Sequence, residues 1–269
     1  RYSSAASDVY KRQLLMNLPS TPSFSLKNKR ALIAGASSGI GLACAVALAE
    51  YGASITIAAR RSQKLEELSA SLKDKGISTE LVELDVSKTN RTLQIINHLD
   101  PFDILVNSAG IAKHSLSVET KESDFDDVMS VNLKGAYFLT MAVARRLISA
   151  NKSGSLINIS SQMGLVGGQE RAVYSASKHA VEGFTKSIAI ELGASNIRVN
   201  TICPTFILTD LTKPTFDDPK KLSWIKSKIK LDRVGKVEDI MGAVVFLASD
   251  ASALITGSSL VIDGGWTAE

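Results

Sequence analysis

The chain has 269 residues, of which 45% are hydrophobic and 22% charged, and its formal net charge is +4 at pH 7. A chain of this length can bury one large core, and the composition is typical of a globular protein rather than a disordered or fibrous one. No apolar run reaches the ~20 residues that cross a bilayer, and no Lys/Arg cluster has the form of a nucleic-acid patch. Neither a membrane nor a nucleic-acid partner is therefore predicted.

Two cysteines, Cys44 and Cys203, lie far apart and lack the spacing of a redox or zinc motif. We expect both to be small apolar side chains in a reducing compartment, which indicates a cytoplasmic protein. Neither a disulfide framework nor a metal site is predicted.

The N-terminal segment is set apart from the rest. Ser3–Gln13, with the sequence SSAASDVYKRQ, is interpreted as a translated sequencing adapter, and it lacks the long apolar core of a signal peptide. No function is assigned to residues 1–13, and residues 14–269 are expected to form one dinucleotide-binding catalytic domain.

From Arg30 onward, short β-rich runs alternate with segments whose apolar residues recur at helical spacing. The expected strands are Ala31–Ala34, Ser54–Ala58, Thr79–Leu84, Ile104–Val106, Ser155–Ile159, Arg198–Ile202 and Ser259–Ile262. The expected helices are Gly39–Tyr51, Ser62–Lys75, Thr89–His98, Ser123–Ala150 (long enough to bend), Ala172–Leu192 and Val237–Ala248. This alternation predicts an α/β, doubly wound (Rossmann) parallel sheet in three α/β/α layers, forming a single domain.

One segment, Thr205–Leu231, breaks the alternation. Two prolines and two adjacent acidic residues precede an amphipathic stretch around Trp224. A long irregular segment inside a compact domain is usually functional or mobile. We expect residues 205–231 to form a substrate lid, with a surface insertion as the alternative.

A glycine-rich turn joins the first expected strand to the first helix. Glycines let the backbone approach a pyrophosphate without an intervening Cβ, and the helix N-terminus supplies N–H groups and a positive dipole. Such a run can also be a simple tight turn, but its place in a doubly wound sheet favours dinucleotide binding. The expected coenzyme contacts are Gly35, Ser37, Ser38, Gly39, Ile40 and Gly41.

The end of the second expected strand indicates which coenzyme is bound. A site for NAD normally carries a carboxylate there, about 20 residues past the glycines, but this strand runs into Ala58-Ala59-Arg60-Arg61. Arg60 offers a fork of donors suited to a ribose 2′-phosphate. NADP(H) is therefore favoured over NAD(H), the alternative being two arginines on an exposed first helical turn.

Tyr174 and Lys178 lie four residues apart at the start of an expected helix, and so share a helix face. A tyrosine has an ordinary pKa of about 10, and a nearby cation lowers that pKa toward the range of a useful acid or base. Ser161 follows a buried strand, so its hydroxyl is expected to point into the ligand crevice. The alternatives are a half-buried ring beside a solvated lysine, and a serine that only caps a turn.

Together, the glycine turn, Asn107-Ser108-Ala109-Gly110, Asn132, Ser161, Tyr174 and Lys178 resemble the short-chain dehydrogenase/reductase family, over about Leu26 to Trp266. The resemblance implies hydride transfer between a nicotinamide and a carbonyl or alcohol carbon. It implies that Tyr174 exchanges the proton with the substrate oxygen, which Ser161 polarises. Lys178 would bind the nicotinamide ribose and lower the pKa of Tyr174, and Asn132 would hold a water that links Lys178 to solvent.

The resemblance also implies further coenzyme contacts and an assembly. Asp85 and Val86 correspond to the adenine side, and Asn107, Ala109 and Gly110 to the adenosine ribose. Pro204, Ile207 and Thr209 correspond to the segment that cups the nicotinamide. A homotetramer or homodimer built on two long helices is implied as well. Three positions depart from the family pattern, and they affect coenzyme affinity and pocket shape rather than chemistry: Ala34, Ser108 and Thr205.

The substrate is less clearly indicated. The expected pocket lining, Gln162, Met163, Gln169 and Arg171, favours a polar substrate, either anionic or polyol-like, and His114 is a weaker candidate. Both 3-oxoacyl-thioester reduction and sugar-acid or polyol oxidation stay open, because several lysines between Lys220 and Lys230 permit an acyl-carrier partner. The alternatives are an NAD-linked dehydrogenase of the same fold and a non-catalytic coenzyme-binding sensor or scaffold.

Overall fold

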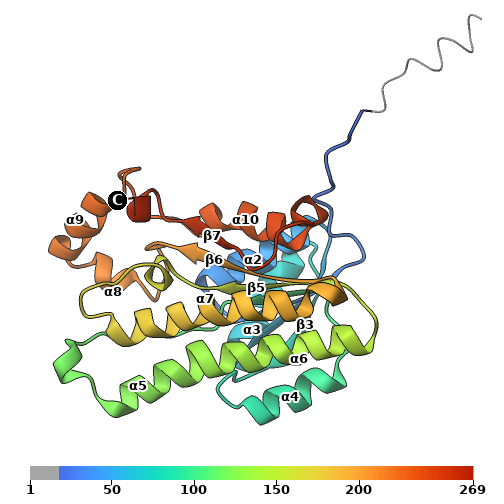
Figure 1. Cartoon of the computed structure of the whole chain (residues 1–269), viewed down its shortest axis with the longest axis horizontal. Helices are drawn as coiled ribbons and strands as arrows, with labels where there is room; N and C mark the ends of the chain where they lie inside the picture. The colour runs from blue at the N-terminus through green and yellow to red at the C-terminus, as the bar shows by residue number, and fades with distance from the viewer. Residues whose placement is uncertain (1–17, 269) are drawn as a thin grey trace, which may run out of the picture.

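A computed structural model describes residues 18–268, so the interpretation of residues 1–13 lies outside the described part of the chain. The strands are β1 (Arg30–Ala34), β2 (Ser54–Ala59), β3 (Thr79–Glu83), β4 (Ile104–Asn107), β5 (Gly154–Ile159), β6 (Ile197–Pro204) and β7 (Ser259–Ile262). The main helices are α2 (Gly39–Glu50), α3 (Ser62–Asp74), α4 (Thr89–His98), α5 (Glu122–Met129), α6 (Ala136–Ser149), α7 (Ala172–Leu192), α8 (Lys213–Phe216), α9 (Pro219–Lys228) and α10 (Glu238–Ala248) (Figure 1).

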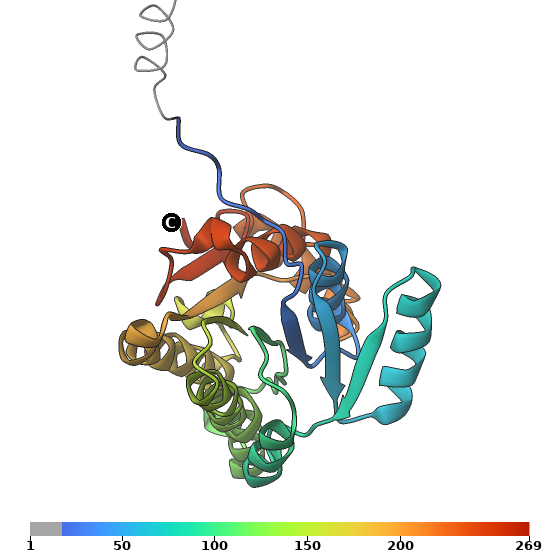
Figure 2. The ribbon, with the colours of Figure 1, turned by 90° about the vertical axis from the view of Figure 1, so that its right-hand side faces the viewer.

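The strands form one seven-stranded sheet in the order β3-β2-β1-β4-β5-β6-β7, with every neighbouring pair parallel. The chain order reverses between β1 and β4, which is the point where a doubly wound sheet opens a crevice at the carboxyl ends of its strands. Helices cover both faces of the sheet (Figure 2). The predicted fold, a doubly wound three-layer α/β/α domain, is confirmed.

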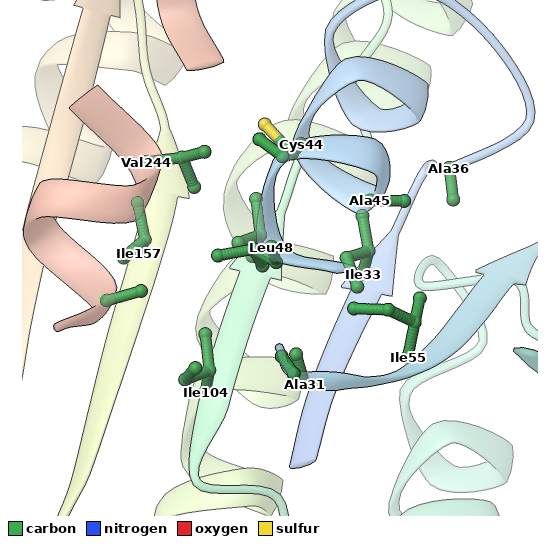
Figure 3. Close-up of a cluster of buried hydrophobic side chains, with 14 of the residues drawn as sticks. Ala31, Ile33, Ala36, Cys44, Ala45, Leu48, Ile55, Ile104, Ile157 and Val244 are labelled. Carbon is green, nitrogen blue, oxygen red and sulfur yellow. The ribbon is translucent and has the colours of Figure 1, made fainter. Parts of the chain in front are cut away.

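Two apolar cores stabilise the sheet from opposite faces. One packs α2, α3 and α10 against the strands, and the other packs α4, α6 and α7. In the first core, Ala45 of α2 lies beside Ile33 of β1, and Val244 of α10 lies by Ile157 of β5 (Figure 3). Strands covered on both sides explain the continuous apolar runs in the sequence, such as Ala31–Ala34.

The long helix expected over Ser123–Ala150 is present, but it changes its winding in the middle. Between α5 and α6 the backbone forms a π-helical stretch, Ser130–Gly135, which contains Asn132. Such π-turns inside α-helices occur frequently at functional sites. Spacing of apolar residues cannot reveal one, because a single widened turn hardly changes the apolar pattern.

The segment 205–231 is less irregular than the sequence indicated, since it contains α8 and α9. Asp218 begins α9 by accepting hydrogen bonds from the backbone N–H groups of Lys220 and Lys221, and Pro219 occupies the first helical position, which favours a helix start. Within residues 18–268, no helix combines the length and the apolarity needed to cross a membrane.

Candidate active site

A cleft of about 320 Å³ runs along the carboxyl ends of β1, β2, β4, β5 and β6. It begins at the glycine turn and ends at the start of α7. Most of the predicted site residues line it: Gly35, Ser37, Ser38, Gly39, Ile40, Arg60, Asp85, Val86, Ala109, Gly110, Ser161, Tyr174, Lys178, Pro204, Ile207 and Thr209. The fold therefore brings together segments that are up to 174 residues apart along the chain, from Gly35 to Thr209.

The glycine turn is built so tightly that side chains are excluded. Gly35 has a φ of +77°, and a Cβ on it would lie 2.6 Å from the backbone nitrogen of Ala109. A Cβ on Gly41 would overlap the carbonyl oxygen of Gly35. Ser38 precedes α2 without a side-chain capping bond, and the first turn of α2 holds no acid. The uncapped N–H groups and the absence of Cβ atoms suit a coenzyme pyrophosphate.

Three predicted site residues do not line the cleft, and two of them support its walls. Gly41 packs beneath the glycine turn. The side chain of Asn107 accepts a hydrogen bond from Ala109 N (3.3 Å) and donates one to Asn158 Oδ1 (3.2 Å), so it braces the turn that Ala109 and Gly110 form. Asn132 is the third and lies behind Gly110.

Asn132 bonds to the loop between β4 and α5 on one side and to α7 on the other. Its Oδ1 accepts from Ile111 N (2.9 Å), and its Nδ2 donates to Ile111 O (2.8 Å) and Ser177 Oγ (3.2 Å). A Cβ on Gly110 would be in ordinary van der Waals contact with Asn132 Oδ1 (3.4 Å) and Lys178 Nζ (3.8 Å), so both side chains lie next to this glycine. The π-helical stretch thus places the Asn132 amide close to Lys178.

At the rim of the cleft, Arg60 follows β2 with an exposed side chain, and Arg61 lies beside it. No acid takes the place of a ribose-binding carboxylate at this strand end. Asp85 lies two residues past the end of β3, where its Oδ1 accepts hydrogen bonds from the backbone N–H and the hydroxyl of Ser87. Asp85 also lines the cleft.

Ser161, Tyr174 and Lys178 converge at the far end of the cleft. Ser161 caps a short turn, because its Oγ accepts from Met163 N (3.1 Å), and it also lines the cleft. Lys178 Nζ lies 5.7 Å from the centre of the Tyr174 ring and donates to Ile159 O (2.8 Å) at the end of β5. That bond fixes the ammonium group beside the strand end.

The environment shifts both titratable groups. Burial raises the pKa of the Tyr174 phenol, while a hydrogen bond with Ser161 and the charge of Arg171 lower it. Burial lowers the pKa of Lys178 to about 8, against the opposing influence of Cys203 and Glu182. The net shift of the Tyr174 pKa is upward, opposite to the lowering expected from Lys178, which is not among the groups that shift it. Two titratable groups with perturbed pKa values in one cleft are nevertheless typical of a catalytic site.

A second cavity of about 280 Å³ lies between the loop that precedes α7 and the helix α9. Met163, Gln169 and Arg171 line it as predicted, whereas Gln162 is only 1% exposed and lines neither cavity. Phe206, Thr215, Lys220, Lys221, Trp224 and Ile225 line it from the segment 205–231. Because Thr205 and Ile207 line the first cleft and Phe206 the second, the two cavities are adjacent.

His114 links Arg171, which lines the second cavity, to Tyr174, which lines the first. Arg171 Nη1 contacts His114 Nε2, and the His114 ring packs edge-on to Tyr174 at 6.5 Å between centres. Burial and the charges of Arg171 and Lys221 lower the pKa of His114 to about 4, so the imidazole is neutral at pH 7 and accepts from the guanidinium. The sequence offered no sign of this contact, because the two residues lie 57 positions apart.

A buried carboxylate behind the site was not anticipated. Glu182 of α7 accepts hydrogen bonds from Thr201 (3.0 Å) and Cys203 (3.3 Å) of β6 and from Ser259 of β7. It thereby ties the helix that carries Tyr174 and Lys178 to the sheet. Its position four residues after Lys178, on the same helix face, is the only signal that could have indicated it.

Comparisons with known proteins agree with this site. Residues 35–267 match the family model described as Enoyl-(Acyl carrier protein) reductase. The chain is 40% identical over 246 residues to the 2-dehydro-3-deoxy-D-gluconate 5-dehydrogenase of Bacillus subtilis, covering 90% of this chain and 96% of the relative. It is 39% identical over 245 residues to a 3-oxoacyl-[acyl-carrier-protein] reductase of Chlamydia trachomatis, covering 89% and 98%.

A solved structure extends this similarity to three dimensions. The gluconate 5-dehydrogenase of Burkholderia cenocepacia, in complex with NADP and tartrate, superimposes with a TM-score of 0.88 at 34% identity, covering 91% of this chain and 98% of that chain. The glycine turn, the Ser161–Tyr174–Lys178 corner and these comparisons lead to one conclusion. The chain belongs to the short-chain dehydrogenase/reductase family and is an NAD(P)-dependent oxidoreductase that acts on the CH–OH group or the corresponding carbonyl.

Proposed function

We propose that this protein interconverts a secondary alcohol and a ketone on a small polar substrate with NADP(H) as its coenzyme. The observation that carries the proposal is the convergence of Ser161, Tyr174 and Lys178 at one end of the cleft whose other end is the glycine turn. A dinucleotide that starts at the turn would extend toward this corner, where its nicotinamide supplies or accepts the hydride.

The protein's own part in the reaction is positioning and proton transfer. In alcohol oxidation the hydroxyl proton of the substrate would pass to the Tyr174 oxygen. Ser161 donates a hydrogen bond to the substrate oxygen, and Lys178 stabilises the tyrosinate that takes the proton. The Asn132 amide lies close to Lys178. In this proposal it holds a water molecule that links Lys178 to solvent as a path for protons. Ketone reduction reverses each step.

The coenzyme preference rests on the arginines at the end of β2. Arg60 is exposed at the cleft rim, where no carboxylate competes for a ribose hydroxyl. A guanidinium binds a 2′-phosphate with a bidentate geometry that a ribose hydroxyl cannot match. The Burkholderia cenocepacia relative, whose structure contains NADP, supports the same choice. NAD-linked catalysis is the alternative.

The relatives support two substrate types, sugar acids and 3-oxoacyl thioesters. The compact second cavity, at about 280 Å³, favours a short, polar substrate over a long acyl chain. We assign the segment 205–231 as the lid over this substrate. It contacts the coenzyme cleft through Thr209, whose Cγ2 would lie 3.1 Å from a Cβ on Gly39, and the second cavity through Trp224.

We also propose that the active protein is a homodimer or homotetramer assembled on α6 and α7, in the cytoplasm. These helices contact each other through Tyr137 and Phe184, whose rings lie 5.7 Å apart. Ile148 and Ile190 are exposed on them, at 48% and 84%, which gives an apolar surface that association would cover. Light scattering that gives a monomer at working concentration would contradict this assembly.

The Tyr174→Phe variant tests the function directly, since it removes only the oxygen that carries the proton. We expect kcat to fall by about 10²–10⁴-fold, the range for loss of a general acid or base. The Kd for NADPH, measured by nicotinamide fluorescence, should stay unchanged, and NADPH should bind more tightly than NADH. Unchanged turnover in this variant would disprove the mechanism. Normal coenzyme binding by a wild-type protein that reduces no carbonyl would favour the non-catalytic alternative.

A further inference from the structure

The second cavity contains a cation whose charge no described acid neutralises. Arg171 immediately precedes α7, is half-buried, and stacks over the Phe206 ring at 5.5 Å. Among residues 18–268 it forms no ion pair. Burial lowers the pKa of Arg171, and the charges of Tyr174 and, after it, Glu170 raise it. Glu170 is the single described acid in the cavity lining, and it forms no ion pair with Arg171. An arginine stays protonated at neutral pH even when burial lowers its pKa.

The other groups around Arg171 increase the positive potential rather than cancel it. Lys220 and Lys221 line the opposite wall. His114 adds no negative charge, because it accepts a hydrogen bond from Arg171 as a neutral ring. A partly desolvated guanidinium with no counter-ion is costly unless an anion arrives to pair with it.

The position of Arg171 relates this charge to the reacting oxygen. It lies three residues before Tyr174, which corresponds to roughly 4.5 Å of rise at the start of a helix. The His114 ring spans the same interval, in contact with Arg171 on one side and 6.5 Å from the Tyr174 ring centre on the other. The charge of Arg171 also acts on the Tyr174 phenol, so a small molecule whose carbonyl meets Ser161 and Tyr174 can extend from the first cleft toward Arg171.

We propose that Arg171 binds the carboxylate of the substrate, and that the natural substrate is a short hydroxy or keto acid with a carboxylate a few carbons from the reacting centre. This inference rests on the proposed function and deepens it. Arg171 acts as a specificity-determining residue, with Lys220 and Lys221 attracting the anion from the cavity mouth. The guanidinium binds both carboxylate oxygens in the fork geometry that charged pairs favour.

The geometry favours a small acid over an acidic carrier protein. A docking surface for a macromolecule requires cations that are exposed and spread over the outside. The lysines of α9 are exposed, but Arg171 is half-buried, packed against Phe206, and lines a cavity together with Trp224 and Ile225. Trp224 itself packs edge-on to Trp266 at 5.3 Å between ring centres, so this wall is an aromatic cluster rather than an open face.

The test compares substrates that differ only in charge. A panel of sugar acids, each paired with the polyol in which CH₂OH replaces the carboxylate (D-gluconate with D-glucitol, D-erythronate with erythritol), is assayed for NADP⁺-dependent oxidation. Wild-type protein is expected to prefer the acid of the productive pair at least tenfold in kcat/KM. In Arg171→Gln, kcat/KM for that acid should fall about 30-fold or more, as expected for a lost charged hydrogen-bonded pair, mainly through KM. The value for the polyol should change little.

Two controls separate carboxylate binding from other effects. Arg171 also lowers the pKa of Tyr174, so its loss can shift the pH–rate profile, but that shift affects acid and polyol alike and leaves their ratio intact. Lys226→Gln removes the same charge from an exposed position on α9 that lines neither cavity, and it should preserve the ratio. NADPH binding by Arg171→Gln verifies that the variant is folded.

The outcomes distinguish the inference from the proposed function. Three results would overturn the carboxylate assignment and leave the proposed oxidoreductase function standing. They are equal turnover of acid and polyol by the wild-type protein, an equal loss of both activities in Arg171→Gln, and turnover of 3-oxoacyl thioesters but of no acid. Failure of the wild-type protein to turn over any carbonyl or alcohol with either coenzyme would instead reject the function itself.

Discussion

The two cavities are adjacent at residues 205–207 but are built from different parts of the chain. The first cleft is formed largely by backbone: glycines at the β1–α2 turn, strand ends, and the Ser108–Gly110 turn. The second is formed by side chains of Arg171, Phe206, Lys221 and Trp224 on a loop and a short helix. The sheet edge holds the first rigidly, whereas the second can change with each substitution on its surface.

This difference explains how one fold serves many substrates. A coenzyme shared by all members requires N–H groups, missing Cβ atoms and one acid–base corner, and these are properties of the backbone and the core. The substrate varies, so its recognition depends on side chains outside the core, where substitutions cost little stability. Three substitutions test whether the first cleft depends on backbone and core in this way, from the largest expected effect to the smallest.

The strongest test of a backbone-built cleft is Gly35→Ala. The new Cβ would lie 2.6 Å from Ala109 N, so the turn that flanks the coenzyme must move. We expect NADPH affinity to fall more than a hundredfold in fluorescence titration. Gly76→Ala is the matched control, because Gly76 has nearly the same φ (+78° against +77°) and nothing within 4 Å of its Cβ position. It should lose about 1–2 kcal/mol of stability from backbone strain and keep its affinity. Equal effects in both variants would refute the steric explanation.

The Lys178→Met variant tests whether burial of the Lys178 ammonium group in the cleft lowers the stability of the folded protein. Burial lowers its pKa from 10.5 to about 8, so the charged form is disfavoured in the folded protein below pH 8, and this cost disappears as pH rises from 8 to 10.5. Lys178→Met removes the cost. Its free energy of unfolding relative to wild type should therefore decrease by up to roughly 3 kcal/mol between pH 7.5 and pH 10, as measured by urea unfolding without coenzyme.

The control for this experiment is Lys186→Met, which changes an exposed lysine on the same helix. Its stability relative to wild type should not depend on pH over this range. A pH-independent difference for Lys178→Met as well would mean that the buried lysine is not desolvated as the structure indicates.

Arg60 differs from the rest of the first cleft, because it would recognise the 2′-phosphate of the coenzyme with an exposed side chain. Arg60→Gln should weaken NADPH binding about tenfold, the effect of one hydrogen bond to a charged group, and leave NADH binding unchanged. Lys75→Gln, at the opposite end of α3, removes the same charge and should change neither affinity. Equal weakening of both coenzymes by Arg60→Gln would show that Arg60 does not read the 2′-phosphate.

Much of the first cleft could be predicted because its determinants are local. Gly35–Gly41 follows a strand and begins a helix, and Tyr174 and Lys178 lie one turn apart on a single helix, so spacing alone groups them. Asn107 and Asn132 were also identified, but as coenzyme and catalytic residues. The structure makes Asn107 a brace beneath the cleft, and it engages Asn132 with Ile111 and Ser177.

The sequence by itself determined the layered sheet, the order of its elements, the glycine turn and the acid–base pair, because each depends on periodicity or on neighbours within a few residues. Only the tertiary structure decided what lies across the sheet edge: the Arg171–His114 contact, the Glu182 network, the π-turn at Asn132, and the meeting of Phe206 with the cavity beside Tyr174. These contacts join residues that are distant along the chain, and their geometry is set by how helices and loops pack on the finished core. No local pattern encodes that packing.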